Sequence, residues 1–206
     1  MRVRIVGHYQ RKDSFHRRAK REGFRSRAAY KLEEIQKSQG LLRRGDRVID
    51  LGCWPGGWLQ VAARAVGPSG RVVGVDVAPI EPALRNQNVV ALCADLTDAV
   101  VPARMLDELG GRADVVLSDA APKLTGVRAR DRAREQALLE AIEALLPVLL
   151  APGGNLLLKV LDGPEAQIVE HRIRRGFQTT RALRPAATRK GSAEHNLLAR
   201  GFHGGG

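Results

Sequence analysis

The hydrophobic residues of this chain fall into short apolar runs that alternate with longer amphipathic segments. Short apolar runs bounded by turn residues are typical of strands buried on both faces of a sheet, and a 3.6-residue period is typical of helices. We expect strands at 47–51, 72–76, 88–93, 113–118 and 155–161, closing strands at 179–183 and 195–199, and helices at 26–36, 58–66, 130–150 and 165–175. This alternation predicts an α/β domain with a mostly parallel, seven-stranded sheet and helices on both faces.

A glycine-rich loop at 52–58 follows the first predicted strand, and single aspartates follow the next ones. Such a loop lets a ligand approach the backbone closely, and the helix after it offers free N–H groups to an anion. Asp76, Asp95 and Asp119 stand at successive strand ends, which meet at one edge of a parallel sheet. Acids also cap strand ends without any ligand, but three of them in register with the loop favour a nucleoside site. Asp76 would bind the hydroxyls of an adenosine ribose, and Asp95 would meet the adenine edge.

The same loop excludes two common nucleotide-binding patterns. Its sequence, Gly-Cys-Trp-Pro-Gly-Gly, differs from the G-x-G-x-x-G pattern of dinucleotide sites. It also lacks the Gly-Lys-Ser/Thr that places a triphosphate and magnesium. The sequence therefore favours neither NAD nor ATP as the ligand.

Positive charge is concentrated at the start of the chain. The formal net charge is +12 at pH 7, and residues 1–31 hold eleven lysines or arginines against two acids. Four aromatic residues stand among these charges: Tyr9, Phe15, Phe24 and Tyr30. Cations bind phosphates and aromatic rings stack on unpaired bases, although a solvated basic tail would show the same charge run. We expect a basic RNA-binding extension over 1–30, a main domain over 31–202 and a flexible tail over 203–206.

The sequence lacks the patterns of a metal site, a secretory signal and a membrane span. Cys53 and Cys93 lie far apart, with no CxxC motif and no cluster of His and Cys. The basic N-terminus has no apolar core of the kind that a signal peptide needs, and no apolar run approaches the length of a membrane span. We expect a cytoplasmic, monomeric protein that binds no metal.

Four further polar residues indicate chemistry: Lys31, Asp119, Lys159 and Glu194. Lys159 lies inside the apolar run of a predicted strand. A lysine buried in a strand is costly unless its amine is paired or neutral. Alternatively, its amine extends past the end of the strand into water.

Five segments of the chain occur in an order and spacing that is specific to one family. They are 23–32, 50–58, 118–122, 150–154 with the Lys-Val pair at 159–160, and 192–194. With these segments the chain resembles the FtsJ/RrmJ-type ribosomal RNA ribose 2′-O-methyltransferases over nearly its whole length, from about 17 to 200. The resemblance implies a Rossmann-like fold, S-adenosylmethionine (SAM) as cofactor, and a uridine of large-subunit (23S) ribosomal RNA as target.

The resemblance also implies roles for individual residues. A catalytic tetrad would consist of Lys31, Asp119, Lys159 and Glu194, and SAM would be contacted by Gly56, Trp58, Asp76, Asp95 and Asp119. Lys159 is then the general base, provided that its amine is neutral. For Trp58 there is a simpler alternative, which is that the indole packs its helix against the sheet.

The chain departs from the family pattern at two places. Trp54 stands where the family commonly has alanine, and its ring would either crowd the methionine end of SAM or turn outward and stack on RNA. His195 and Asn196 follow Glu194, where the family has a Glu-x-Tyr pattern. A lone histidine on a strand is more often structural, so we assign His195 no catalytic role.

Three other functions stay open from the sequence. The chain could methylate transfer RNA or another RNA, because nothing in the extension encodes a particular target. It could be a ribosome-assembly factor that binds RNA with little or no methyl transfer. A SAM enzyme acting on protein or a small molecule is disfavoured by the basic extension and by the catalytic lysines.

Overall fold

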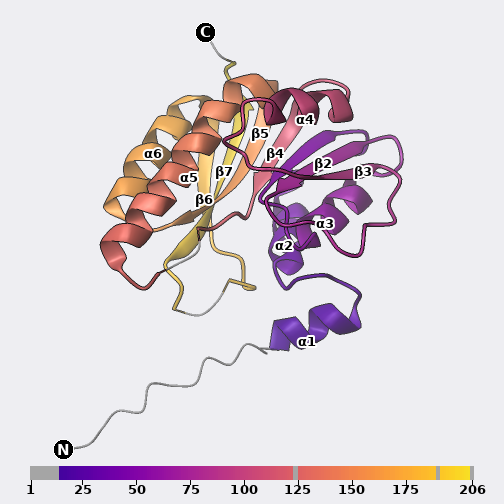
Figure 1. The fold of residues 1–206 in the computed structure, drawn as a ribbon, viewed down its shortest axis with the longest axis horizontal. Helices are drawn as coiled ribbons and strands as arrows, with labels where there is room; N and C mark the ends of the chain where they lie inside the picture. Colours follow the sequence, from indigo (N-terminus) through magenta and orange to yellow (C-terminus); the bar gives the residue numbers. More distant parts are fainter. Residues whose placement is uncertain (1–13, 123–124, 189–190, 205–206) are drawn as a thin grey trace, which may run out of the picture.

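A single seven-stranded sheet forms the centre of the molecule (Figure 1). The computed structural model describes residues 14–122, 125–188 and 191–204. The strands are β1 (Arg47–Leu51), β2 (Arg71–Asp76), β3 (Val89–Cys93), β4 (Ala113–Ser118), β5 (Leu150–Leu161), β6 (Phe177–Leu183) and β7 (Glu194–Phe202). Their order is β3-β2-β1-β4-β5-β7-β6, and β7 runs antiparallel to both of its neighbours. The predicted fold class is confirmed.

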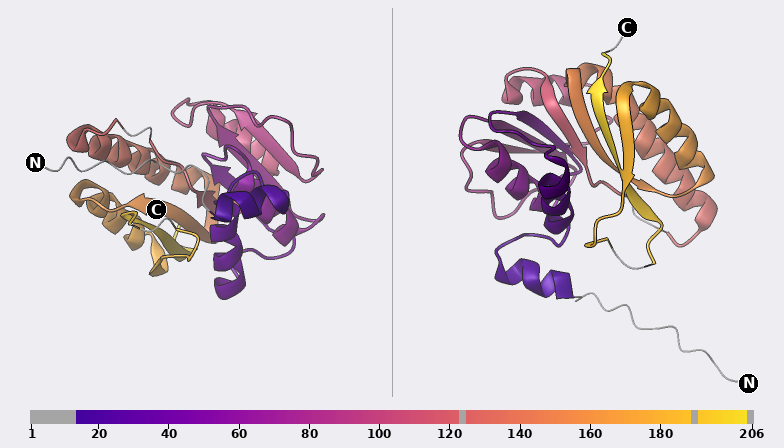
Figure 2. Two further views of the ribbon diagram at one scale, coloured as in Figure 1. Left: turned by 90° about the horizontal axis from the view of Figure 1, so that it is seen from below. Right: turned by 180° about the vertical axis from the view of Figure 1, so that it is seen from behind.

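Helices cover both faces of this sheet (Figure 2). They are α1 (Ser14–Arg21), α2 (Ala29–Gln39), α3 (Gly57–Val66), α4 (Val101–Leu109), α5 (Arg128–Leu149) and α6 (Pro164–Arg175). Buried residues of α1, α2 and α3 share one core cluster with the sheet, and those of α4, α5 and α6 share the other. Within the described segments, no helix is both long and apolar enough to cross a membrane.

The two-residue period of β5 decides which side chains meet which helices. Leu156, Leu158 and Val160 pack in the cluster that contains α5 and α6. Leu157, between them, packs in the cluster that contains α2 and α3. Successive side chains of a strand point to opposite faces, so Lys159 lies on the same face as Leu157. The fold therefore directs this lysine toward α2.

The structure differs from the sequence prediction in two additional helices and in several element boundaries, the largest difference being at the start of β5. The short helices α1 and α4 were not predicted, and β5 begins at Leu150, within the segment expected to end a helix. Helix α4 begins with Val101 and Pro102, residue types that disfavour a helix interior. The proline stands in the first turn, where its missing N–H would have had no partner. Helix α1 has only eight residues, and its apolar face consists of Phe15 and Ala19 alone, which is too short a pattern to predict a helix from the sequence.

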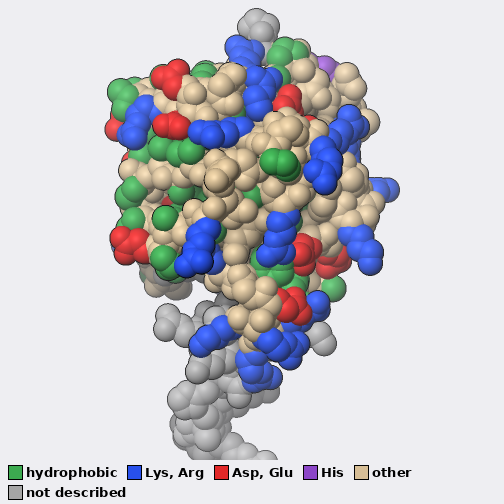
Figure 3. Space-filling view, turned by 90° about the vertical axis from the view of Figure 1, so that its right-hand side faces the viewer, with side chains coloured by type: hydrophobic (Ala, Val, Ile, Leu, Met, Phe, Trp, Pro, Cys, Tyr) green, Lys and Arg blue, Asp and Glu red, His purple; other side chains and the backbone are tan. Residues whose placement is uncertain are grey.

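The basic surface of the N-terminal region is carried by α1, as Figure 3 shows. Its exposed cations are Arg17, Arg18, Lys20 and Arg21. The expectation that Phe24 and Tyr30 stack on RNA bases is wrong, because both rings are buried. They meet edge to face at 5.3 Å, and the guanidinium of Arg64 lies over Phe24 at 4.7 Å. Phe15 packs against Tyr30 at 5.8 Å, and Tyr9 lies outside the described residues.

His195 joins the start of β7 to α6 through two carboxylates. Its Nδ1 lies 2.8 Å from Asp162 Oδ1, and its Nε2 lies 3.1 Å from Glu170 Oε1. Arg174 and Arg184 pair with the same two acids at 2.7 and 2.9 Å. The hydrogen bond to Glu170 is the largest influence on His195 and raises its pKa above the ordinary value, although burial opposes this. These contacts hold His195, the residue next to Glu194, against α6 and the segment after β5.

The His195 network predicts a pH-dependent contribution to stability. Its pKa is raised in the folded state, so the contribution is complete below the ordinary value of about 6.5 and is lost as the pH rises through the folded-state pKa. We expect His195→Gln to lower the free energy of unfolding more at about pH 6 than at about pH 9 in urea titrations. An equal loss at both pH values would show that the imidazolium contributes nothing.

The core predicts a contrast between two isoleucines on neighbouring helices. Ile142 of α5 is fully buried, whereas Ile168 of α6 is 60% exposed. Truncating the buried side chain leaves a cavity, so Ile142→Ala should lower the free energy of unfolding by about 2–5 kcal/mol. Ile168→Ala is the matched control and should change it by less than about 0.5 kcal/mol. Urea unfolding measures both, and similar values for the two variants would contradict this core assignment.

Candidate active site

The carboxyl ends of the parallel strands meet the beginning of β7 at one edge of the sheet. Asp76 is the last residue of β2, and Asp119 directly follows β4. Because β7 is antiparallel to β5, its first residue, Glu194, pairs with Leu161 at the end of β5. Lys159 lies two positions earlier in that strand and pairs with Asn196. The topology alone therefore gathers residues that are distant in the sequence.

Four of the predicted site residues form one cluster of charges. Lys31 Nζ lies 3.1 Å from Asp119 Oδ1 and 2.5 Å from Glu194 Oε1. Lys159 Nζ lies 3.5 Å from the same Asp119 oxygen and donates a hydrogen bond of 2.5 Å to the Asp119 backbone carbonyl. Both lysines are only 7% exposed. The structure thus brings together the four residues that were predicted as a tetrad.

The two lysines have different surroundings. Burial alone would lower the pKa of Lys31, but the charges of Asp119 and Glu194, together with its hydrogen bonds to them, outweigh burial and raise that pKa. Lys31 therefore carries a positive charge at neutral pH. Lys159 shares one carboxylate oxygen with Lys31 and otherwise meets a neutral carbonyl. Of the two amines, Lys159 is the one that pairs with fewer acids of the cluster.

A cavity of about 830 Å³ opens beside this cluster. Its lining includes Gly52, Trp54, Asp76, Asp95 and Asp119. Sites for small molecules in proteins have volumes of about 300–1,000 Å³, so the cavity is large enough for a nucleoside. Gly52 is required at its floor, because a Cβ there would lie 2.5 Å from the Cβ of Ala120.

The two acids at the cavity wall are fixed by backbone N–H groups. Asp76 accepts from Trp54 N and Ala78 N, each at 2.9 Å through a different oxygen. Asp95 accepts from Thr97 N and Oγ1 through Oδ1, and these bonds hold its pKa below the ordinary value. Carboxylate oxygens can accept more than one hydrogen bond. Both acids therefore stay able to accept from a ligand while their positions are set.

Two of the predicted cofactor-binding residues do not line this cavity. Trp58 is buried in the core cluster of α2 and α3, and its Nε1 donates to the Ala28 carbonyl at 2.8 Å. Gly56 has a φ of 102°, which favours glycine, and Arg25 lies 3.1 Å from where its Cβ would be. These positions indicate that Trp58 packs α3 into the core and that Gly56 permits the turn of the loop. By contrast, Trp54 lines the cavity and is 58% exposed.

Sequence reasoning missed two buried polar residues beside the site. Both oxygens of Asp50 lack a hydrogen-bond partner among the described residues, and burial, with the charges of Asp119 and Asp76, raises its pKa well above the ordinary value. The side-chain amide of Asn196 is likewise buried and unpaired in the described part of the chain, on the residue opposite Lys159. The only sequence signal for either was a polar residue inside an apolar strand. No group of three or more His, Cys, Asp or Glu residues suited to a metal ion occurs in the described segments.

Comparisons with known proteins agree with this geometry. Residues 24–202 match the model of the FtsJ-like methyltransferase family. The ribosomal RNA large subunit methyltransferase E of Methanothermobacter thermautotrophicus is 43% identical, over 95% of this chain and 92% of its own length. The protein of the same name from Acidithiobacillus ferrooxidans is 41% identical, over 94% and 87%.

Solved structures show the same fold. A crystal structure described as a ribosomal RNA methyltransferase of Plasmodium falciparum is 25% identical and superposes with a TM-score of 0.76, covering 88% of this chain and 100% of that one. Aeropyrum pernix fibrillarin, with bound S-adenosyl-L-methionine, shares the fold at 18% identity and a TM-score of 0.60, covering 84% and 73%. With its motifs, its sheet order and a family match across most of its length, the chain belongs to the FtsJ-like methyltransferases.

Proposed function

We propose that this protein transfers the methyl group of SAM to a ribose 2′-hydroxyl of RNA, at a uridine of large-subunit (23S) ribosomal RNA. The observation that carries the proposal is the buried Lys-Asp-Lys-Glu cluster beside a nucleoside-sized cavity. The names of the relatives support ribosomal RNA as the substrate class. The ribose hydroxyl is inferred from the chemistry of the cluster.

A ribose hydroxyl is a weak acid and becomes a good nucleophile only when its proton is removed. Bound SAM supplies an electrophilic methyl group on a cationic sulfonium, so the transfer requires no metal. Lys159 in its neutral form would take the proton of the hydroxyl as its oxygen forms the new bond to carbon, and SAM would supply the methyl group and keep the electrons of the broken C–S bond on its sulfur. General-base assistance contributes roughly 10²–10⁴-fold, and positioning of the attacking oxygen supplies much of the rest.

The other members of the cluster position the substrate and compensate the charge of Lys31. Lys31, whose pKa is raised, stays charged and is suited to hold the ribose or an adjacent phosphate. Asp119 links the two lysines, and Glu194 neutralises Lys31. Lys159 therefore shares its one acidic partner in the cluster with the charged Lys31.

The cavity beside the cluster would bind the cofactor. Asp76 binds the ribose hydroxyls of SAM, Asp95 meets the adenine, and Asp119 lies where the cofactor and the tetrad meet. Gly56 and Trp58 act through the conformation of the loop and through its packing.

The RNA would be bound by the basic extension. Helix α1 presents exposed cations and ends close to α2, which carries Lys31. Contacts with phosphates are independent of base sequence, so this surface gives affinity but does not select the target. The extension over 1–30, the monomeric state and the cytoplasmic location stay predictions.

One observation favours a second candidate function. The exposed ring of Trp54 lines the cofactor cavity, where a bulky side chain can weaken SAM binding. A ribosome-assembly factor that binds RNA without methyl transfer would result. The complete tetrad argues against it, because four clustered catalytic side chains have no purpose in a protein that only binds RNA.

Transfer of labelled methyl from SAM to large ribosomal subunits that lack the modification tests the proposal. We expect the wild-type protein to label the ribosomal RNA and Lys159→Ala to reduce the rate by at least about 10²-fold, because the general base is gone. The dissociation constant of SAM should stay within about twofold. Loss of SAM binding together with activity would mean that Lys159 is structural. Absence of label from the wild type, despite RNA binding, would favour the assembly factor.

The cofactor assignment predicts the effect of Asp76→Ala. Removing a charged acceptor of two hydroxyls should weaken SAM binding at least about tenfold, measured by calorimetry. Asp107→Ala, an exposed aspartate of α4, is the control and should leave the affinity unchanged. An unchanged affinity in the Asp76 variant would remove this residue from the cofactor site.

A further inference from the structure

A second, smaller cavity lies at the same edge of the sheet as the tetrad. Its volume is about 240 Å³, and it lies between the N-terminal half of α5 and the beginning of α6. Its lining includes Arg128, Arg132, Glu135, Leu161, Asp162 and Glu165. We call it the Glu135 cavity. The mechanism proposed above does not use it.

The Glu135 cavity adjoins the catalytic cluster. Leu161, in its wall, lies two residues beyond Lys159 and pairs with Glu194. Glu135 Oε1 accepts a hydrogen bond of 3.0 Å from Leu161 N, and the carboxylate interacts electrostatically with Lys159. A group bound in this cavity would therefore lie next to the reacting ribose.

One carboxylate oxygen of Glu135 is a hydrogen-bond acceptor that receives no hydrogen bond from the described residues. The residue is only 4% exposed, and its Oε2 is buried with no hydrogen-bond partner among the described residues. Glu165 Oε2, in the same cavity wall, is also buried, and Arg132 Nε lies 3.9 Å away, beyond hydrogen-bonding distance. A buried carboxylate oxygen without a partner costs free energy, and binding sites are where such a cost is retained.

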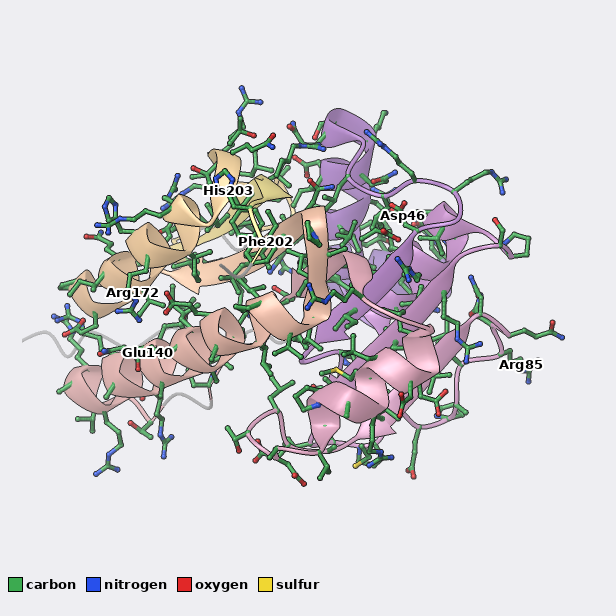
Figure 4. The ribbon with its side chains drawn as sticks, turned by 90° about the horizontal axis from the view of Figure 1, so that it is seen from above. Asp46, Arg85, Glu140, Arg172, Phe202 and His203 are labelled. Carbon is green, nitrogen blue, oxygen red and sulfur yellow. The ribbon has the colours of Figure 1, made fainter. Side chains whose placement is uncertain are left out.

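The cavity also offers donors. Helix α6 begins at Pro164, and its cap, Gly163, has no side-chain oxygen to accept the N–H groups of the first turn. Arg128 and Arg132 add two guanidinium groups beside four acids of the lining, Asp131, Glu135, Asp162 and Glu165, and no metal-binding group of acids occurs among the described residues. The walls are braced, because Arg172 of α6 pairs with Glu140 and Glu143 of α5 at 3.4 and 2.7 Å, as the neighbouring labels in Figure 4 indicate. The occupant must therefore present donors and acceptors together.

We propose that the Glu135 cavity binds one unpaired base of the RNA substrate beside the methylated ribose, through an edge with a ring N–H next to a carbonyl, as in guanine or uracil. The ring N–H donates to Glu135 Oε2, and the carbonyl accepts from the first turn of α6. Unpaired bases are commonly read by such hydrogen bonds and by stacking on guanidinium planes, which Arg128 and Arg132 offer. The volume is below that of most small-molecule sites, about 300–1,000 Å³, and suits a single base. This inference rests on the proposed function.

Glu135→Gln tests the subsite. The variant keeps the shape of the side chain and, through its amide oxygen, the bond to Leu161 N, but it turns an amide N–H₂ toward the base. We expect kcat/KM for large ribosomal subunits to fall at least about tenfold through KM, with SAM affinity unchanged. The stability to urea should be unchanged or higher, because a buried charge is removed. Glu108→Gln, at an exposed acid of α4, is the control and should match the wild type.

Three results would overturn the inference. A loss confined to kcat would make Glu135 an electrostatic partner of Lys159 instead. A parallel loss of stability and activity would make it structural. Wild-type kinetics in the variant would leave the cavity without a role.

Binding of nucleoside monophosphates separates this inference from the proposed function. Saturation-transfer NMR is recorded with GMP, UMP, AMP and CMP while S-adenosylhomocysteine blocks the cofactor cavity. We expect signals from GMP or UMP with the wild type and Glu108→Gln, and none with Glu135→Gln. Equal signals from all four nucleotides and all three proteins would overturn the subsite. If the wild type transfers no methyl group, the proposed function fails, and this measurement still decides whether the cavity binds a base.

Discussion

One carboxylate oxygen of Asp119 lies within ion-pair distance of two buried lysines, and the rest of the site depends on this arrangement. Buried lysine amines need acids nearby, since an uncompensated buried charge would be costly. Glu194 supplies the second acid to Lys31 only because β7 runs antiparallel and begins where β5 ends. The reversed strand thus completes the cluster. Of its two acids, Lys159 pairs only with Asp119, at 3.5 Å, whereas Lys31 pairs with both.

The two faces of the sheet contribute different parts of the site around this cluster. The period of β5 directs Lys159 to the face covered by α2, which carries Lys31. On the other face, α5 and α6 enclose the Glu135 cavity just past the end of the same strand. The ends of β2 and β4 supply the cofactor cavity on the far side of Asp119. Cofactor, reacting ribose and neighbouring base would therefore lie along one edge, and α5 would line both the cofactor cavity and the Glu135 cavity.

Sequence patterns predicted the strands, the sheet edge and the four members of the cluster, because these depend on local periodicity and on motif spacing. They could not predict that Phe24 and Tyr30 are buried, since this follows from packing between α1, α2 and α3. The sequence also could not show that polar side-chain atoms of Glu135 and Asn196 are buried without hydrogen-bond partners among the described residues. From the sequence, a glutamate on a helix is expected to be exposed, and only the fold shows which face of the helix is covered. Helix α4 was not predicted because Pro102 disfavours a helix interior. The structure places this proline in the first turn, where it is tolerated.

The central claim is that the cluster activates a ribose hydroxyl and not a base nitrogen or carbon. The position of the transferred methyl group tests it most directly. Ribosomal RNA labelled by the wild-type protein is digested to nucleosides and analysed by mass spectrometry, with alkaline hydrolysis in parallel. The account predicts 2′-O-methyluridine and an alkali-resistant dinucleotide, because a methylated 2′-oxygen cannot attack the adjacent phosphate. A methyl group on the base, with complete alkaline cleavage, would contradict the assignment of Lys159 and its partners to ribose chemistry.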